Sequence, residues 1–524
     1  MKRHSPQHVA QAVTISLLAC FTAAFTPRSV TAVTLNPLFG DHAVVQRGEP
    51  VAVWGTAEPH ADVAVTAAGV VARTVADAAG RWRVQLGPIV AEGPFTLVAQ
   101  SGERTATSRD VVTGEVWLAS GQSNMARALR QAATGQDAIA RADDPSMRFF
   151  KVAARRSLTS RSRVEGSWAV VSPETAPHVS AVAYFFAERL RAEMGRPVGI
   201  IQAAVGGTTG ETWLPLERVR ATPALGGYAK AWEVIEREHP QLASEPDEAL
   251  ESWEHAERSF RESMRAFRRG DRNERPQRTA PNPYRDAIGA HYRAMIEPVA
   301  PYRIRGMIWY QGEANARSPE MGRDYAPLLT ALIESWRAEW RRPDLPFLFV
   351  QLPEFSAREG WWWVRDSQRR VAATVPHTAM VVSLGSGDMN DIHPARKAPV
   401  GEGLARSALR LAYQRPGPVS GPIAVRAEFR RDAAEVRFIH VDGGLRVEPA
   451  SHSGFEIADD TGAFHPAQVR VVAPDRLMVR APGAGRATAV RYGFANDPPL
   501  TLFDESGLPA SPFIESNPTT RTHP

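Results

Sequence analysis

Cysteine is nearly absent from this chain, since Cys20 is the one cysteine among 524 residues. It lies inside an apolar stretch that follows Lys2 and Arg3 and ends in small residues up to Ala32, the pattern of a secretory signal. A mature chain that begins after this stretch would have neither a thiol nor a disulfide. The sequence therefore predicts a signal peptide over residues 1–32 and a secreted or periplasmic protein, with lipid attachment at Cys20 as the less favoured alternative.

Long apolar runs and an excess of one charge are also missing. Beyond the N-terminal stretch, no apolar segment is long enough to cross a bilayer. The formal net charge is only +5, and the basic residues are scattered among acids, which argues against a nucleic-acid partner. No group of His, Cys, Asp and Glu has the spacing of a metal site. With 43% hydrophobic and 23% charged residues, the chain is predicted to be globular and to contain more than one domain.

Two regions consist of short alternating apolar and polar segments separated by turn residues. Segments such as "VAVWGTA" and "RWRVQLG" occur in the first region, and "AEVRFIHV" and "RLMVRAP" occur in the second. Alternation with a period of two is typical of antiparallel strands. The sequence thus predicts two β-rich, sandwich-like units over residues 33–112 and 416–515, followed by a tail over residues 516–524.

The region between them, residues 113–415, alternates apolar strand-like runs with helix-like stretches. This pattern predicts an α/β domain with a mostly parallel sheet. One clear helix is expected over "SAVAYFFAERLRAEMG", which ends at Gly195. The stretch from about 217 to 290 is rich in Glu, Arg and Ala and is interrupted by proline, so it is predicted to be a helical insertion that faces solvent.

Polar and small residues follow four of the apolar runs. Ligands of open α/β sheets bind beyond the carboxyl ends of the strands, so these endings are the candidate site. They are "SGQSN" at 120–124, "GGTT" at 206–209, "QGEAN" at 311–315 and "SGDMNDIHP" at 386–394. Each one alone is more often an ordinary turn or a helix cap. Four of them in one domain favour a catalytic site.

These residue types fit acyl transfer. A serine hydroxyl becomes a nucleophile when an imidazole takes its proton, and a carboxylate orients that imidazole, which Ser123, His393 and Asp391 could provide. The developing oxyanion needs hydrogen-bond donors. The backbone amides of Ser123 and Gly207 and the side-chain amide of Gln311 are the predicted donors.

The motifs "GQSNM", "GGTTGETW", "WYQGEAN" and "NDIHP" together resemble the sialate O-acetylesterase family of the SGNH hydrolase superfamily. The closing segment "FDESGLPASPF" and the opening "LNPLFGDHAVVQRGEPVAVWG" extend the resemblance over nearly the whole mature chain. The resemblance implies a three-layer α/β/α core with Ser123 as nucleophile, His393 as base, and Gly207 with Gln311 as oxyanion partners. It also implies removal of O-acetyl groups from sugars without a metal or an organic cofactor.

The identity of the acid that partners the histidine stays open at this point. The wider superfamily commonly places it three residues before the histidine, and here that position is Asn390. Asp391 lies two residues before the histidine and Asp388 five, while related carbohydrate acetylesterases use a glutamate at the position of Glu313. We expect Asp391 first, Glu313 second and Asp388 third.

Five further residues are candidates for contact with an acetylated sugar. An indole can stack on a sugar ring, so one or two rings of the run from Trp361 to Trp363 are candidates, although core packing with a loop anchor is the favoured interpretation of the run. Trp213 is expected in the core or in a pocket wall rather than as a stacking platform. The candidates are Gln122, Asn124, Trp213, Asn315 and Trp362.

The predicted function is that of a secreted serine esterase that deacetylates carbohydrates. Two alternatives are an esterase for acetylated xylan or another polysaccharide, and a carbohydrate-binding scaffold without catalysis. Ser123 and His393 are both present, which argues against the scaffold, because a protein that had lost catalysis would be expected to have lost one of them.

Overall fold

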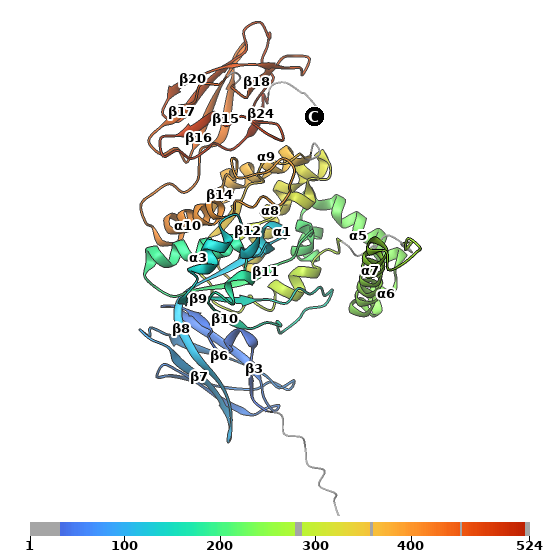
Figure 1. Ribbon diagram of the computed structural model, residues 1–524, viewed down its shortest axis with the longest axis vertical. Helices are drawn as coiled ribbons and strands as arrows, with labels where there is room; N and C mark the ends of the chain where they lie inside the picture. The colour runs from blue at the N-terminus through green and yellow to red at the C-terminus, as the bar shows by residue number, and fades with distance from the viewer. Residues whose placement is uncertain (1–31, 278–285, 357–359, 451–452, 519–524) are drawn as a thin grey trace, which may run out of the picture.

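The computed structural model describes residues 32–277, 286–356, 360–450 and 453–518. The predicted signal peptide with Cys20 lies outside these residues, as does most of the tail expected over 516–524. Figure 1 shows a β-rich N-terminal region, a central region of strands and helices, and a β-rich C-terminal region arranged along the longest axis. No helix among the described residues is long and apolar enough to cross a membrane.

The N-terminal region is built from short strands with alternating burial. In β6, for example, Trp82, Val84 and Leu86 are buried while their neighbours are exposed. One sheet has the order β1-β3-β6, and β4 pairs with both β5 and β7. These strands are β1 (Thr34–Leu35), β2 (Val44–Gln46), β3 (Pro50–Thr56), β4 (Asp62–Ala67), β5 (Val70–Val75), β6 (Arg81–Pro88) and β7 (Phe95–Ser101).

A single long strand, β8 (Arg104–Gly121), connects this region to the centre of the molecule. Its first part pairs antiparallel with β7, and its last part pairs parallel with β11 and β12. The domain boundary expected between residues 112 and 113 therefore falls inside a continuous strand. The N-terminal strands also share one buried hydrophobic cluster with the central region.

The central sheet runs in the order β10-β9-β11-β8-β12-β13-β14. From β9 to β14 adjacent strands pair parallel, whereas β10 pairs antiparallel with β9. The sheet as a whole is mixed, because β8 also pairs antiparallel with β7, and the expected α/β class is confirmed at that level. The remaining strands are β9 (Asp144–Lys151), β10 (Trp168–Val171), β11 (Val198–Ala204), β12 (Gly306–Tyr310), β13 (Phe347–Val350) and β14 (Thr378–Val381).

Helices pack beside this sheet in two pairs, α3 with α10 and α8 with α9. The helix expected before Gly195 is α3: the Ser180 side chain caps its first turn and Gly195 ends it with φ +64°. Figure 1 shows α5, α6 and α7 to one side of the sheet, within the predicted helical stretch. The helices are α1 (Ser123–Ala126), α2 (Gly135–Ala140), α3 (Ala181–Met194), α4 (Leu216–Ala221), α5 (Gly226–Glu238), α6 (Gln241–Ser244), α7 (Pro246–Arg269), α8 (Pro319–Glu339), α9 (Gly360–Thr374) and α10 (Ala398–Tyr413).

The C-terminal region has a hydrophobic cluster of its own. Its sheets have the orders β15-β16-β21-β20 and β19-β18-β22-β24, and β17 pairs with β23. Arg369 of α9 joins it to the central region by donating to the carbonyl oxygens of Ala424 and Ile514. The strands are β15 (Ile423–Phe429), β16 (Ala433–Ile439), β17 (Leu445–Val447), β18 (Phe455–Ala458), β19 (Phe464–Pro466), β20 (Gln468–Ala473), β21 (Arg476–Arg480), β22 (Ala489–Tyr492), β23 (Leu502–Asp504) and β24 (Phe513–Ser516).

Register brings the ends of three central strands to one edge. Gly121 at the end of β8 lies opposite Ala204 of β11 on one side and Tyr310 of β12 on the other. The loops that begin after these residues therefore leave the sheet side by side, and they carry three of the four motifs singled out in the sequence.

Candidate active site

Ser123 is the first residue of α1, two residues after β8 ends. The turn depends on Gly121, which has φ +135° and whose added Cβ would lie 2.2 Å from the Tyr310 carbonyl oxygen. The next residue, Gln122, donates its backbone N–H to that same oxygen at 2.9 Å. The close approach of β8 to β12 thus requires glycine here, and it fixes Ser123 at the carboxyl edge of the sheet.

Backbone donors without partners surround Ser123. The Ser123 side chain is half-buried, and neither its Oγ nor its N–H has a hydrogen-bond partner among the described residues. The loop after β11 lies against it, because a Cβ added at Gly206 would be 3.4 Å from Ser123 Cβ. In the described part of the chain, the N–H groups of Gly206 and Gly207 also have no acceptor. Unpaired N–H groups beside a serine are what an oxyanion would need.

His393 lies in the loop after β14, with 28% of its side chain exposed. Its Nδ1 is 3.7 Å from Asp391 Oδ1, which is longer than a hydrogen bond, while that oxygen accepts the His393 backbone N–H at 2.8 Å. Burial lowers the pKa of His393, the charge of Arg127 lowers it further, and Asp391 opposes both. The imidazole is therefore neutral and able to accept a proton at neutral pH. Asp388 is exposed and accepts the N–H of Asn390 instead.

Asn124 joins the serine turn to the histidine loop. Its Nδ2 donates to Glu313 Oε1 at 2.5 Å and to the carbonyl oxygen of Ile392 at 2.9 Å. Its Oδ1 accepts from Lys397 Nζ at 2.6 Å. The residue after Ser123 is thereby bonded to the residue before His393, so three of the four motifs meet at one buried amide.

Glu313 and Lys397 are two buried titratable residues that the Asn124 side chain bridges. Burial raises the pKa of Glu313, and the hydrogen bond from Asn124 and the charge of Lys397 oppose that shift. Burial lowers the pKa of Lys397 to about 8, against the effect of Glu313. The other oxygen of Glu313, Oε2, is buried without a partner among the described residues. Sequence reasoning missed Lys397, for which the spacing of four residues after His393 was the one available signal.

Gln311 is fully buried and ties the strand-end loops together. Its Nε2 donates to Asn315 Oδ1 at 2.7 Å, to the Thr208 carbonyl oxygen at 3.1 Å and to Gln122 Oε1 at 3.2 Å. The side-chain amide has two hydrogens, so these acceptors occupy it fully. The role of Gln311 as an oxyanion donor stays a prediction. The contacts present hold the loops after β8, β11 and β12 together.

Four of the five side chains expected to contact sugar lie inside the protein. Gln122, Asn124 and Asn315 are buried and bonded to other protein groups; Asn315, for example, donates to Glu211 Oε2 at 3.0 Å. Trp213 is fully buried and its ring stacks on that of His291, with centroids 4.9 Å apart. These side chains shape the site from behind and offer no free face to a ligand.

Two tryptophans of the run 361–363 differ in burial. Trp361 is buried and donates its indole N–H to the Pro353 carbonyl oxygen. Trp362 is half-buried, with its ring 6.0 Å from that of Phe494 in the C-terminal region. Trp362 is therefore the one of the five candidates that keeps an accessible surface.

Glu354 is a further residue that the sequence did not reveal. Its carboxylate accepts the backbone N–H groups of Gly385 and Gly387, the latter at 2.9 Å, and so shapes the loop that leads to His393. No group of three or more His, Cys, Asp and Glu residues in the described ranges is arranged to hold a metal ion.

A family model matches the central part of the chain. It describes a carbohydrate esterase, sialic acid-specific acetylesterase, and it aligns with residues 113–226 and 262–410. These residues make up half of the chain and include Ser123 and His393. The chain belongs to this family. The stretch that the model leaves out, 227–261, falls in the helical segment containing α5, α6 and most of α7.

Relatives of the esterase extend over nearly its full length. The sialate O-acetylesterase of Mus musculus is 26% identical over 90% of this chain and 93% of its own, and that of Rattus norvegicus is 28% identical over 90% and 92%. A carbohydrate acetylesterase from Xanthomonas citri has a solved structure that matches with a TM-score of 0.76 and 32% identity, covering 93% of this chain and all of that one. The protein is thus a carbohydrate esterase, a carboxylic ester hydrolase.

Proposed function

We propose that this esterase is a secreted enzyme that removes O-acetyl groups from carbohydrates, with O-acetylated sialic acid as the favoured substrate. The observation that carries the assignment of the site is the double contact of Asn124, which joins the turn of Ser123 to the loop of His393. This contact supports pairing the Ser123 hydroxyl with the His393 imidazole. In structures without substrate, catalytic hydrogen bonds are often long, so a direct Ser123–His393 bond is not required.

In the proposed reaction, Ser123 Oγ attacks the acetyl carbonyl carbon and His393 takes the hydroxyl proton. The carbonyl oxygen becomes an oxyanion, which the N–H groups of Ser123 and Gly207 stabilise. The bond to the sugar oxygen then breaks, and His393 returns its proton to that oxygen. Water attacks the acetyl-serine with His393 again as base, which releases acetate and restores Ser123.

Asp391 is the carboxylate that we assign to His393 in this scheme. Its Oδ1 lies 3.7 Å from the Nδ1 of the ring, and its charge acts to raise the pKa of His393. Glu313 is the alternative, because Asn124 brings its buried carboxylate to the same loop. Gln311 contributes by holding the loop of Gly207 through Thr208.

The architecture that we infer around the site is a three-layer α/β/α core of the SGNH type. The parallel run of strands from β9 to β14 and the packed helix pairs support it. The units over residues 33–112 and 416–515 would be accessory β-rich domains, with the helical insertion at about 217–290 between strands of the core.

The identity of the acetylated sugar is a separate part of the proposal. Two relatives are named as sialate O-acetylesterases, which favours sialic acid, whereas the Xanthomonas citri relative is named only as a carbohydrate acetylesterase. Acetylated xylan is the second candidate. Acetate release should be compared on O-acetylated sialic acids and acetylated xylans under the same conditions, and a preference for xylan would reverse the choice.

The nucleophile can be tested with a matched pair of serine variants. Ser123→Ala should reduce hydrolysis of a chromogenic acetate to background and abolish labelling by a fluorophosphonate. Ser120→Ala is the control, because Ser120 lies buried three residues earlier in β8 and its Oγ has no partner among the described residues. Turnover by Ser123→Ala at the rate of the parent would refute the assignment.

A further inference from the structure

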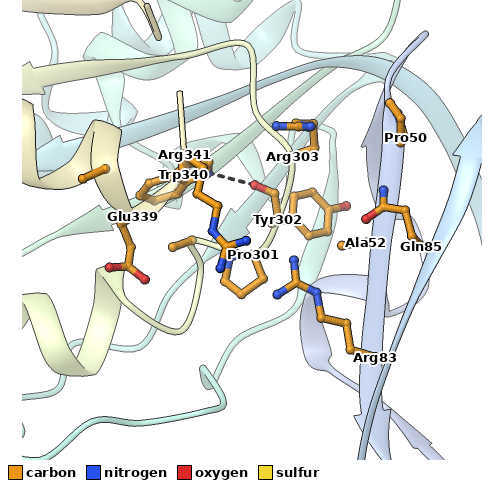
Figure 2. Close-up of a pocket in the computed structure, with 12 residues that line it drawn as sticks. Pro50, Ala52, Arg83, Gln85, Pro301, Tyr302, Arg303, Glu339, Trp340 and Arg341 are labelled. Atoms are coloured by element: carbon orange, nitrogen blue, oxygen red, sulfur yellow. Dashed lines mark hydrogen bonds between the residues drawn. The ribbon is translucent and has the colours of Figure 1, made fainter. Parts of the chain in front are cut away.

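A cavity of about 470 Å³ lies between the N-terminal β-rich region and the central region. Figure 2 shows that Arg83 and Gln85 enter it from one side, while Tyr302, Arg303 and Arg341 enter it from the other. Arg83 and Gln85 belong to β6, and Arg341 follows the end of α8. Its volume is in the range of small-molecule sites.

The charges in this cavity are mostly uncompensated. Neither the Arg83 nor the Arg341 guanidinium has a carboxylate partner among the described residues. Burial lowers the pKa of Arg83, and the positive charge of Arg341 lowers it further, so the two groups repel each other. Like charges held together without a counter-charge favour binding of an anion.

Two acids lie near these arginines, and both already have partners. Glu49 pairs with the lining residue Arg303 at 3.1 Å and is shared with two further arginines. Glu339 lines the cavity, and its Oε2 accepts the Tyr292 hydroxyl at 2.9 Å. Of the three lining arginines, Arg83 and Arg341 therefore keep a charge that no ion pair among the described residues compensates.

This cavity is separate from the candidate active site. Arg303 precedes β12, and Arg341 precedes β13, so both lie at the amino ends of parallel strands. Ser123 lies beyond the carboxyl end of β8, which is parallel to them. At about 3.3 Å per residue, a strand of five residues puts the two edges on the order of 15 Å apart.

A second cavity, of about 380 Å³, adjoins the first and shares Arg83 and Pro301 with it. Its lining adds Trp54 and Trp82, and the buried indole N–H of Trp82 has no hydrogen-bond partner in the described part of the chain. An indole beside cationic donors suits a sugar ring that carries an acidic group.

We propose that the arginine-lined cavity binds the carboxylate of an acidic oligosaccharide, as a second sugar site at the edge of the sheet opposite Ser123. Guanidinium groups bind carboxylates with two parallel hydrogen bonds, and the adjoining cavity gives room for the sugar ring. The site would hold an acidic glycan on the protein while its esters are processed elsewhere. The inference goes beyond the proposed function: the binding does not rest on it, and only the processing of esters on the bound glycan does.

Titration calorimetry on the full-length protein tests this site. The probes are sialyllactose, trigalacturonate and lactose, none of which carries an ester that the enzyme could consume. Both acidic sugars should bind and lactose should not, and the ratio of the two acidic affinities distinguishes a sialic acid from a uronic acid as the source of the carboxylate. Affinity should fall with added salt.

Arg83→Gln and Arg341→Gln should each weaken binding of the acidic sugars by about tenfold or more, since each removes a charged hydrogen-bond donor. Arg73→Gln is the matched control, because Arg73 is an exposed arginine of β5 in the same β-rich region that does not line either cavity. Equal binding by the Arg83 and Arg341 variants, equal binding of lactose, or equally strong competition by a single-stranded oligonucleotide would each overturn the proposal. All three variants replace exposed arginines and should keep the urea midpoint of the parent.

Discussion

Replacing Asp391 by asparagine removes a negative charge beside His393 but keeps an oxygen that can accept the His393 N–H. The loop should therefore hold its shape, and the change isolates the charge. His393 Nδ1 and Asp391 Oδ1 lie 3.7 Å apart. Once His393 has taken the serine proton, the attraction between imidazolium and carboxylate at that distance is about 4 kcal/mol for an effective dielectric constant of 20 and about 1 kcal/mol for that of water.

Exposure decides between these limits. The Asp391 side chain is 51% exposed and the His393 side chain 28%, so the lower part of the range applies. A loss of about 1–2 kcal/mol of stabilisation of the imidazolium corresponds to roughly 5- to 30-fold in kcat/KM. Because Asp391 raises the pKa of His393, its removal should also move the acidic limb of the kcat/KM profile to lower pH.

The assay is hydrolysis of a chromogenic acetate by Asp391→Asn. It is measured from about pH 4 to 9, a range that brackets the ordinary pKa of histidine, about 6.5. Asp388→Asn is the control, because Asp388 accepts a backbone N–H two residues ahead in the same way but does not contact His393. An unchanged rate would show that Asp391 is not the partner, and a loss of about 10⁴-fold, as for a buried triad aspartate, would refute the exposure argument. A loss in Glu313→Gln with none in Asp391→Asn would transfer the role to Glu313.

Two other substitutions test the surroundings of Ser123 and His393. Arg127→Ala should raise the pKa of His393 and so move the acidic limb of the kcat/KM profile to higher pH. Arg130→Ala, three residues later, is the control and should leave that limb in place. Identical pH profiles for the two variants would contradict the role given to Arg127. Gly121→Ala should lower the free energy of unfolding in urea by about 3 kcal/mol or more, because its Cβ would meet the Tyr310 carbonyl at 2.2 Å, and an unchanged midpoint would refute the close approach.

The location of the site could be predicted from sequence because it depends on local pattern. Apolar runs that end in small and polar residues mark the carboxyl ends of strands, and the register of β8, β11 and β12 brings those ends together. The α/β class and the helix that ends at Gly195 follow from the same kind of periodicity.

The burial of the polar residues could not be predicted in this way. Gln122, Asn315 and Lys397 belong to segments that look like solvated loops, and they become buried because several loops converge on one another. Such convergence is a property of tertiary packing, and no periodicity within one segment encodes it. The sequence therefore singled out Gln122 and Asn315 near the candidate site but assigned them to the ligand instead of to the supporting network, and it did not single out Lys397.

The continuity of β8 across the expected boundary between residues 112 and 113 is a further feature that local pattern did not reveal. Gly114 lies in "VVTGEVWLA", between two apolar runs. In the structure it lies within β8, and an added Cβ would be 2.3 Å from the Pro197 carbonyl oxygen. The glycine permits a close crossing of two chain segments and does not end the strand.

The pairing of β8 with β7 is interrupted by a bulge, so the two ends of this long strand do not share one phase of side-chain alternation. Leu97 pairs with Ser108 but Phe95 pairs with Val111, so β8 has one extra residue between these pairs, and Asp110 there has φ +54°. An extra residue in a strand exchanges the two faces of everything that follows it. The same continuous strand can therefore bury one set of side chains in the N-terminal region and an independently chosen set in the central sheet.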